Sequence, residues 1–241
     1  MHTRQQIAAY AVHVFTASGV VFGFLALIAT LEGQVFTAFA YLGLALIIDG
    51  VDGTLARAVR VNEATPQIDG GALDFVIDYF TYAVVPAVMV LQWQLVPTGW
   101  EMPTSTAIML VSCYTFANKN MKTADGYFLG FPATWNILLF YLLIFATGPW
   151  VTLALIALCL LLSFVPTAYV HPFRVRRFMP LTLLMTSLWM GSSAVLAWHV
   201  LVDQSPASAA PLPFWALIVS SLYLGGLSTA RSLAPQRPAG G

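Results

Sequence analysis

Long apolar stretches dominate the chain and decide what it can fold into. Eight of them can be drawn, at about 10–31, 35–58, 68–94, 104–118, 133–148, 150–169, 180–201 and 212–230. Most come near the roughly twenty residues that an α-helix needs to cross the hydrocarbon core of a bilayer. Inside hydrocarbon a segment must satisfy its own backbone N–H and C=O groups, which a helix does by itself. We therefore expect an all-α integral membrane protein with about eight transmembrane helices.

Composition supports this expectation. Hydrophobic residues make up 59% of the chain and charged residues only 8%, which is far from the balance of a soluble domain. No internal repeat or second domain is visible, so residues 1–241 form one polytopic membrane domain, and we expect the first apolar stretch to stay in the mature protein. The Pro- and Gly-containing segment 232–241 is expected to be a mobile tail. Membrane lipids are the expected surroundings, and no nucleic-acid partner is expected.

The distribution of basic residues predicts the orientation. All ten lie at the two ends of the chain or in the second, fourth and sixth connections between apolar stretches: Arg4, Arg57, Arg60, Lys119, Lys122, Arg174, Arg176, Arg177, Arg231 and Arg237. The other connections carry acids such as Glu32, Glu101 and Asp203. Cytoplasmic connections of membrane proteins carry the excess of Lys and Arg. Both termini are therefore expected in the cytoplasm, in agreement with an even number of spans.

One polar segment interrupts the apolar pattern between residues 49 and 78. Its first half places four residues at i, i+3, i+4 and i+7, which is one face of a helix: Asp49, Asp52, Gly53 and Ala56. Its second half places three more at i, i+4 and i+8: Gly70, Asp74 and Asp78. Ionised side chains beside a membrane are costly and need a compensating cation or a function. Two helices with these stripes facing each other would gather four carboxylates around one small volume.

The residue types of this segment indicate a particular chemistry. Carboxylates without Cys or His are the ligands that Mg²⁺ or Mn²⁺ prefers. Gly53, Ala56 and Gly70 leave room for a bulky ligand or a partner helix to approach the backbone. Arg57 adds a permanent cation whose planar fork suits phosphate oxygens. A substrate with a pyrophosphate group fits such a site, whereas the alternative is a purely structural polar network between helices.

These residues also carry a family resemblance. The chain resembles the CDP-alcohol phosphotransferase family, whose signature it matches at all eight positions: Asp49, Asp52, Gly53, Ala56, Arg57, Gly70, Asp74 and Asp78. The resemblance implies the helical bundle of that family and the metal-dependent transfer of a phosphatidyl or related group from a CDP-linked donor to an alcohol, with release of CMP. Twelve residues separate Arg57 from Gly70, a longer gap than in much of the family. With segments 16–19, 121–123 and 130–136, this gap resembles the bacterial phosphatidylcholine synthase branch.

The resemblance also implies substrates and residue roles. CDP-diacylglycerol would be the donor and choline the acceptor, in a bacterial inner membrane, with a homodimer as a possible assembly. Asp49, Asp52 and Asp74 would be metal ligands, and Asp78 would be both a ligand and the general base for the attacking hydroxyl. The donor would contact Gly53, Ala56, Arg57, Gly70 and Thr16. Thr16 could equally bond the backbone, and the basic loops could bind donor phosphates or anionic lipid head groups.

The acceptor is less constrained by the sequence. Aromatic rings hold a quaternary ammonium through cation–π attraction, and the candidates near the signature or in the polar connections are Tyr79, Tyr82, Tyr127, Trp135 and the neighbouring Asn136. Aromatic residues are also common at membrane interfaces. Serine, inositol phosphate or glycerol phosphate are alternative acceptors. A cation transporter is the alternative from another class, but its site would be expected at the bilayer midplane on broken helices, often with inverted repeats.

Overall fold

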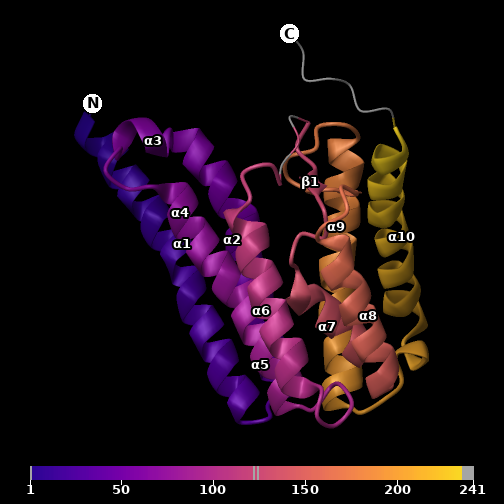
Figure 1. Cartoon of the computed structure of the whole chain (residues 1–241). Coiled ribbons are helices and arrows are strands. Elements are labelled where there is room, and N and C mark those ends of the chain that lie inside the picture. Colours follow the sequence, from indigo (N-terminus) through magenta and orange to yellow (C-terminus); the bar gives the residue numbers. More distant parts are fainter. Residues whose placement is uncertain (1, 122, 124, 235–241) are drawn as a thin grey trace.

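The computed structural model of the chain describes residues 2–121, 123 and 125–234. Lys122, Arg237 and most of the predicted tail lie outside the described residues. The described chain is all-α apart from one short pair of strands (Figure 1), which confirms the expected fold class. Its first elements are α1 (His2–Leu31), α2 (Val35–Val59), α3 (Val61–Ala64), α4 (Gly70–Asp78), the π-helix η1 (Tyr79–Val84), α5 (Val85–Gln92) and α6 (Glu101–Ala117). Then follow β1 (Phe128–Leu129), α7 (Trp135–Ile144), α8 (Pro149–Leu162), β2 (Ala168–Tyr169), α9 (Met179–Ala197), the π-helix η2 (Trp198–Val202), the 3₁₀-helix η3 (Ala207–Ala209) and α10 (Pro211–Leu233).

Each predicted apolar stretch contains a helix, but the helices differ in length. Five segments are long and apolar enough to cross a membrane: Thr3–Leu31, Val35–Val59, Gly70–Gln92, Met179–Val202 and Pro211–Leu233. The remaining three stretches form the shorter helices α6, α7 and α8. α7 stops early because Ala146 adopts a left-handed backbone with φ 48° and Pro149 then starts α8. The chain is thus an integral membrane protein of helices.

Many large apolar side chains on these helices point outward. Val14, Phe24, Leu110, Leu161 and Leu222 are each more than half exposed. A soluble protein would cover such a surface, whereas hydrocarbon solvates it. The interior is filled by a single large cluster, whose bulkiest fully buried members include Met89, Ile108, Trp135 and Leu139. Because the apolar exterior surrounds a packed interior, the helices form one bundle.

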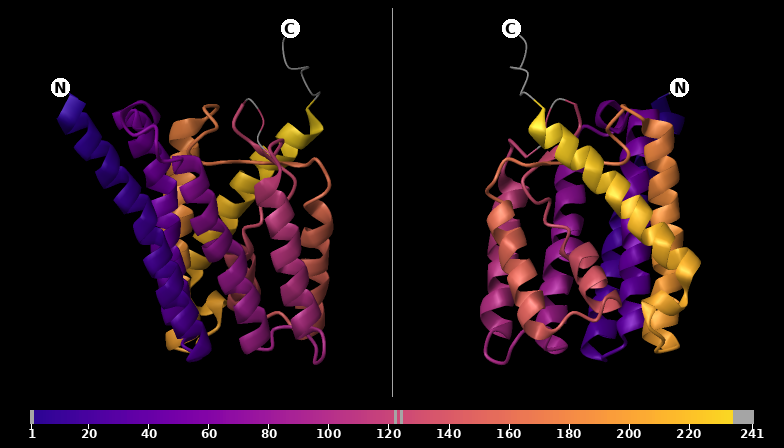
Figure 2. Two further views of the ribbon diagram at one scale, coloured as in Figure 1. Left: turned by 60° about the vertical axis from the view of Figure 1, so that its left-hand side comes forward. Right: turned by 90° about the vertical axis from the view of Figure 1, so that its right-hand side faces the viewer.

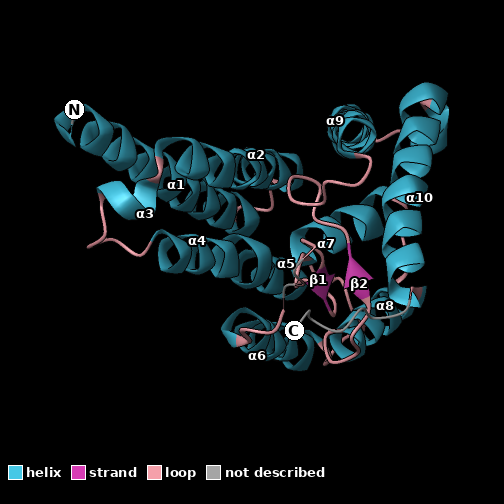
Figure 3. Ribbon diagram, turned by 90° about the horizontal axis from the view of Figure 1, so that it is seen from above, coloured by secondary structure: helices cyan, strands magenta, loops and turns pink. Residues whose placement is uncertain are grey.

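The helices are arranged in two groups. α1, α2 and the helix from α4 to α5 lie along one side, and α7 to α10 lie along the other (Figures 1 and 3). α10 crosses its side obliquely (Figure 2). The start of α1, the end of α10, α3 and the strand pair lie at the same end of the bundle, together with the beginning of α4 and the end of α2 (Figure 1). We call this the polar end, because the described basic residues also lie there.

The third apolar stretch is one helix that changes its winding directly after Asp78. The π-helix η1 lies between α4 and α5. Pro86 lies near the start of α5 and has no N–H for the Tyr82 carbonyl one turn earlier, with which its ring would also collide in a regular α-helix. A wider π-turn absorbs this mismatch, and such turns are frequent at functional sites. Residues 79–84 are therefore positioned by Pro86 as well as by their own sequence.

The strand pair joins two loops at the polar end. β1 and β2 are antiparallel, with Phe128 opposite Tyr169 and Leu129 opposite Ala168. β2 and the residue after it are held by α10: the Ala168 N–H donates to Ser232 Oγ at 2.8 Å, and the Val170 N–H donates to Ser228 Oγ at 3.0 Å. Residues 232 and 233, with which the predicted tail begins, belong to α10.

Candidate active site

Three of the four signature aspartates meet at the polar end, as the facing stripes predict. Carboxylate oxygens of Asp49 on α2 and of Asp74 and Asp78 on α4 lie within 4.8 Å of one another. Oxygens around one Mg²⁺ ion lie about 3–4 Å apart, since each is about 2.1 Å from the metal. A small adjustment of these side chains would therefore let them share an ion. The acidic cluster could bind a divalent cation, and its all-oxygen donor set fits Mg²⁺ or Mn²⁺.

The fourth aspartate, Asp52, is buried beside this cluster. It lines the same small cavity of about 10 Å³, which we call the acidic pocket, together with Thr16, Gly19, Ala45, Ile48, Asp49, Asp74, Ile77, Asp78 and Thr81. The Thr16 hydroxyl hydrogen-bonds the Asp52 side chain, which is only 6% exposed. A volume of this size holds one water molecule or one ion. The acidic pocket therefore has no room for the body of a substrate, which must approach it from outside.

Tyr82 contacts the acidic cluster directly. Its hydroxyl donates to Asp49 Oδ2 at 2.8 Å, and its side chain is buried. Groups that bond the metal-binding residues of a protein from behind fix their orientation. The sequence indicates Tyr82 only as a ring near Asp78. In the structure, its hydroxyl orients the Asp49 carboxylate.

The small signature residues lie where helices or side chains come close. A Cβ atom on Gly70 would lie 3.3 Å from the His13 ring on α1, and one on Gly53 would lie 3.3 Å from the guanidinium of Arg57. Ala56 packs into a small cluster between α1, α2 and α3. Asp69 caps α4 by accepting from the Ala72 N–H at 3.0 Å. The Gly70 contact brings the start of α4 close to α1, and the Ala56 cluster packs α2 and α3 against α1, so both aspartate-bearing helices pack on the same helix.

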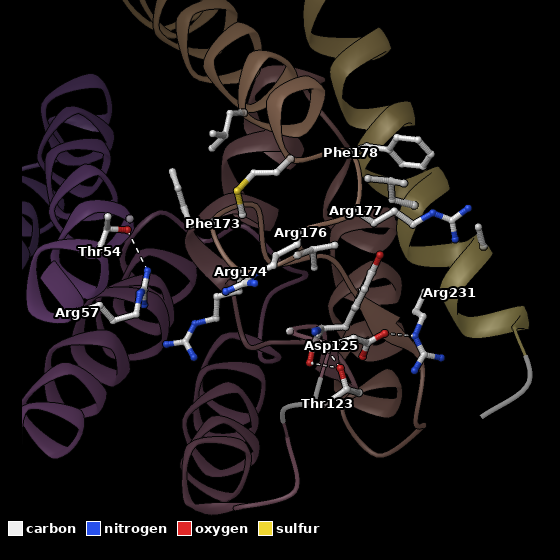
Figure 4. Close-up of a pocket in the computed structure, with 18 of the residues that line it drawn as sticks. Thr54, Arg57, Thr123, Asp125, Phe173, Arg174, Arg176, Arg177, Phe178 and Arg231 are labelled. Carbon is white, nitrogen blue, oxygen red and sulfur yellow. Dashed lines mark hydrogen bonds and ion pairs between the residues drawn. The ribbon is translucent and has the colours of Figure 1, made fainter. Parts of the chain in front are cut away.

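A second, much larger cavity opens next to the acidic pocket. It has a volume of about 1200 Å³ and lies between α2, α9, α10 and the two loops that the strand pair joins (Figure 4). Five arginines line it, and we call it the arginine cavity: Arg57, Arg174, Arg176, Arg177 and Arg231. Arg57 and Arg174 also lie near enough to Asp52 to interact with its negative charge. The two cavities are therefore neighbours of opposite sign.

One acid lies among these arginines. Arg231 Nε donates to Asp125 Oδ2 at 2.7 Å. This hydrogen bond holds the pKa of the Asp125 carboxyl below its ordinary value. Arg57 donates to Thr54 Oγ1 at 3.0 Å. In the described part of the chain, the ion pairs involve Arg60, Arg231 and His199, so no carboxylate pairs directly with Arg174, Arg176 or Arg177.

Two glycines outside the signature hold in place the loop between β2 and α9, which carries Arg174, Arg176 and Arg177. A Cβ on Gly50 of α2 would come within 2.9 Å of the Phe173 ring, so this ring packs on bare helix backbone. Gly126 has φ +89°, and a Cβ there would lie 3.1 Å from the backbone of Arg174. The first contact places the residue before Arg174 against α2, and the second places Arg174 against the loop that precedes β1. The sequence reveals neither contact. It shows only that a glycine, Gly50, follows Asp49.

The residues predicted to hold choline lie in different surroundings. The Tyr79 hydroxyl donates to the Met109 carbonyl of α6 at 3.2 Å. Tyr127 lines the arginine cavity, with the guanidinium of Arg231 5.9 Å from its ring centre. The structure thus separates two of the candidate rings from Tyr82 and from the acidic pocket.

Trp135 and Asn136 lie at the start of α7. Trp135 is fully buried and donates its indole N–H to Ser112 Oγ at 2.7 Å. The Asn136 side-chain oxygen accepts from the Ile137 N–H at 2.9 Å. Neither residue lines the acidic pocket or the arginine cavity. Trp135 also packs edge-on against the Phe131 ring, and Asn136 is buried as well.

Comparison with known proteins adds an independent observation. No family model matches the chain. A phosphatidylcholine synthase of Pseudomonas aeruginosa is 40% identical over 224 residues, which cover 93% of this chain and 92% of that protein. Phosphatidylcholine synthases of Brucella melitensis and Agrobacterium fabrum are 34% and 36% identical, over 97% and 91% of this chain and 82% and 88% of those proteins. The similarity therefore spans both the helices that carry the aspartates and the loops that carry the arginines.

Proposed function

Because the chain belongs to the phosphatidylcholine synthases of the CDP-alcohol phosphotransferase family, we propose that it transfers the phosphatidyl group of CDP-diacylglycerol to choline and releases CMP. The observation that carries the proposal is the meeting of Asp49, Asp74 and Asp78 at the polar end. A metal-assisted transfer needs such a set of carboxylates beside a cavity that can admit a nucleotide-linked lipid.

Asp49, Asp52, Asp74 and Asp78 would hold Mn²⁺ or Mg²⁺. When bound, the metal supplies positive charge that neutralises the donor's diphosphate and the leaving CMP. Tyr82 keeps Asp49 oriented, and Thr16 does the same for Asp52. Both hydroxyls would thereby preserve the arrangement of the carboxylates while substrates bind and products leave.

The donor would lie across the border between the two cavities. Arg57 and Arg174 are the cations nearest to Asp52 and would bind the phosphate oxygens of the donor. Gly53 keeps the backbone beside Arg57 open, and Gly70, Ala56 and Thr16 complete the predicted donor site. The acidic pocket is too small for the nucleotide, so the cytidine and lipid parts require the space outside it.

Asp78 would act as the general base. Its carboxylate accepts the proton of the choline hydroxyl, whose oxygen attacks the phosphorus that carries diacylglycerol. The bond from that phosphorus to the bridging oxygen breaks, CMP leaves with the electron pair, and phosphatidylcholine forms. For the choline head group we retain Tyr79, Tyr82, Tyr127, Trp135 and Asn136 as the predicted residues, of which Tyr82 contacts the acidic cluster.

The proposed site faces the cytoplasm. We propose that α6, α7 and α8 cross the membrane with the five longer segments, which gives eight spans and places both termini and the polar end on the cytoplasmic side of a bacterial inner membrane. The support is that the described basic residues lie at the polar end. A cysteine-accessibility assay with a membrane-impermeant thiol reagent, applied to variants with a new cysteine at Arg60 or at Asp203, tests this orientation.

The reaction is tested with purified protein, CDP-diacylglycerol, Mn²⁺ and a panel of alcohols, with CMP release as the readout. Choline should support release, and EDTA should abolish it until Mn²⁺ is restored in excess. Serine should not replace choline. If serine, inositol phosphate or glycerol phosphate supported release and choline did not, the acceptor would be wrong while the metal-dependent transfer would stand.

A further inference from the structure

We propose that the arginine cavity holds the phosphate of a membrane lipid at Arg176 and Arg177, next to the site of the reaction. The first reason is charge. Arg57 and Arg174 lie on the side of the cavity that faces Asp52, and Arg231 is paired with Asp125. Arg176 and Arg177 therefore remain as two exposed cations in one loop, and choline, being a cation itself, cannot be what they attract.

The second reason is the lining of the cavity below these arginines. Its walls continue along α2, α9 and α10 with apolar side chains, among them Val51, Met179, Leu183 and Leu227. These residues belong to helix segments long and apolar enough to cross a membrane. A cavity with cations at its polar end and apolar walls along membrane helices matches an anionic head group followed by acyl chains.

The third reason is that the loop is held before any ligand arrives. Phe173 packs on Gly50, and the backbone of Arg174 packs on Gly126. Ser228 and Ser232 of α10 bind the backbone just before the loop. Figure 4 shows Arg57 on the α2 side, Arg177 and Arg231 on the α10 side, and Arg174 and Arg176 between them. A site whose backbone is already ordered loses less entropy on binding.

A lipid phosphate could come from two sources, which share this chemistry: an acidic phospholipid of the bilayer, or the donor itself. The test uses the full-length protein in neutral detergent with EDTA, so that the metal site plays no part and the result is independent of the proposed reaction. Native mass spectrometry compares the binding of phosphatidylglycerol and of phosphatidylcholine with the same acyl chains. The variants are Arg176→Gln/Arg177→Gln and, as the control, Arg60→Gln.

Arg60 is a suitable control because it is exposed at the same end and pairs with Glu63. The double variant should lose at least about tenfold in phosphatidylglycerol affinity, and Arg60→Gln should stay within about twofold. One-for-one displacement by CDP-diacylglycerol would assign the site to the donor, and simultaneous binding would assign it to a bilayer lipid. Inorganic phosphate should compete only weakly, because it lacks the acyl chains.

Equal affinity of the double variant and the Arg60→Gln control would overturn the proposal, as would equal binding of phosphatidylglycerol and phosphatidylcholine by the wild-type protein. Inorganic phosphate that competes as well as a lipid would refute the role of the apolar walls. If the double variant did not fold, the salt dependence of wild-type binding would decide. Binding through two arginines should weaken clearly between 50 and 300 mM salt, and unchanged affinity would refute it.

Discussion

The acidic pocket and the arginine cavity are neighbours at the same end of the bundle, yet they are built differently. The acidic pocket is small, and its carboxylates project from two helices, α2 and α4. The arginine cavity is large, and three of its five arginines come from one loop that glycines and α10 hold in place. Helical periodicity aligns the acids of each helix on one face, so that only two helices must meet to gather them, whereas the arginines meet only after several distant segments pack. The first region is thus suited to a metal ion and the second to the phosphates of larger ligands.

The comparison is tested most strongly at Asp78. Asp78→Asn should lower the rate of CMP release at least about a thousandfold, because the variant loses the proposed base, while appreciable donor binding remains. Asp52→Asn should weaken donor binding as well, through loss of metal. Steady-state kinetics and equilibrium binding of CDP-diacylglycerol measure the two effects. Equal donor affinity in both variants would contradict this division of roles.

Tyr82→Phe distinguishes a positioning hydroxyl from a choline-binding ring. The variant keeps the ring and loses the bond to Asp49, so its affinity for Mn²⁺ should fall about 10- to 100-fold, with a smaller change in the KM for choline. Calorimetric titration with Mn²⁺ provides a readout that does not depend on activity. Trp135→Phe is the matched control, because it loses a hydrogen bond to Ser112 instead. A fall in Mn²⁺ affinity of the same size in both variants would refute the role of the hydroxyl.

Arg174→Gln probes the border between the two regions. Removal of this cation should raise the KM for CDP-diacylglycerol about five- to tenfold, whereas Mn²⁺ affinity should change little. Gly50→Ala should act in the same direction more weakly, because its Cβ would displace the Phe173 ring that precedes Arg174. Kinetics at saturating choline measure both. If the KM for CDP-diacylglycerol were unchanged in Arg174→Gln, the donor's phosphates would bind at the acidic pocket without help from the arginine cavity.

The smallest expected effect concerns the ion pair of Asp125 and Arg231. The bond from Arg231 lowers the pKa of Asp125 in the folded protein. The carboxyl therefore adds stability above its unfolded pKa of about 3.9, and this contribution is lost as the pH falls through the lower folded pKa. Since both side chains are partly exposed, Asp125→Asn should cost less than about 1 kcal/mol at pH 7.

Thermal unfolding in detergent measures this difference. The gap in stability between wild type and Asp125→Asn should be present at pH 7, should begin to shrink below about pH 4, and should close once the pH is below the lowered folded pKa, where the carboxyl is protonated in both states. A gap that grows as the pH falls would have the wrong sign for a carboxyl whose pKa is lowered by folding. Asp203→Asn, at the opposite end of the bundle, is a control for the loss of a negative charge.

The sequence by itself determined the class of fold and the acidic cluster. Apolar stretches of membrane-spanning length must become helices, since backbone polar groups have no other partners in hydrocarbon. Aspartates spaced by three and four residues must then share a face. The sequence therefore predicted that Asp49, Asp74 and Asp78 would meet if the two helices faced each other, and the structure brings their carboxylates together. The shortness of α7 was harder to foresee, because it depends on the backbone turn at Ala146.

Only the tertiary structure decided how the other groups relate to that cluster. Tyr82 reaches Asp49 across helices, with Pro86 and the π-turn between Tyr79 and Val84 setting its position. Arg174 lies between α2 and the loop before β1 because Gly50 permits close packing of Phe173 and Gly126 permits close packing of the Arg174 backbone. Such contacts join residues that are far apart in the sequence. The bond between Tyr82 and Asp49, for example, spans 33 positions, and no helical period relates residues over that separation. Helical spacing governs neighbours on one helix, whereas contacts between helices and loops depend on side-chain shape and packing.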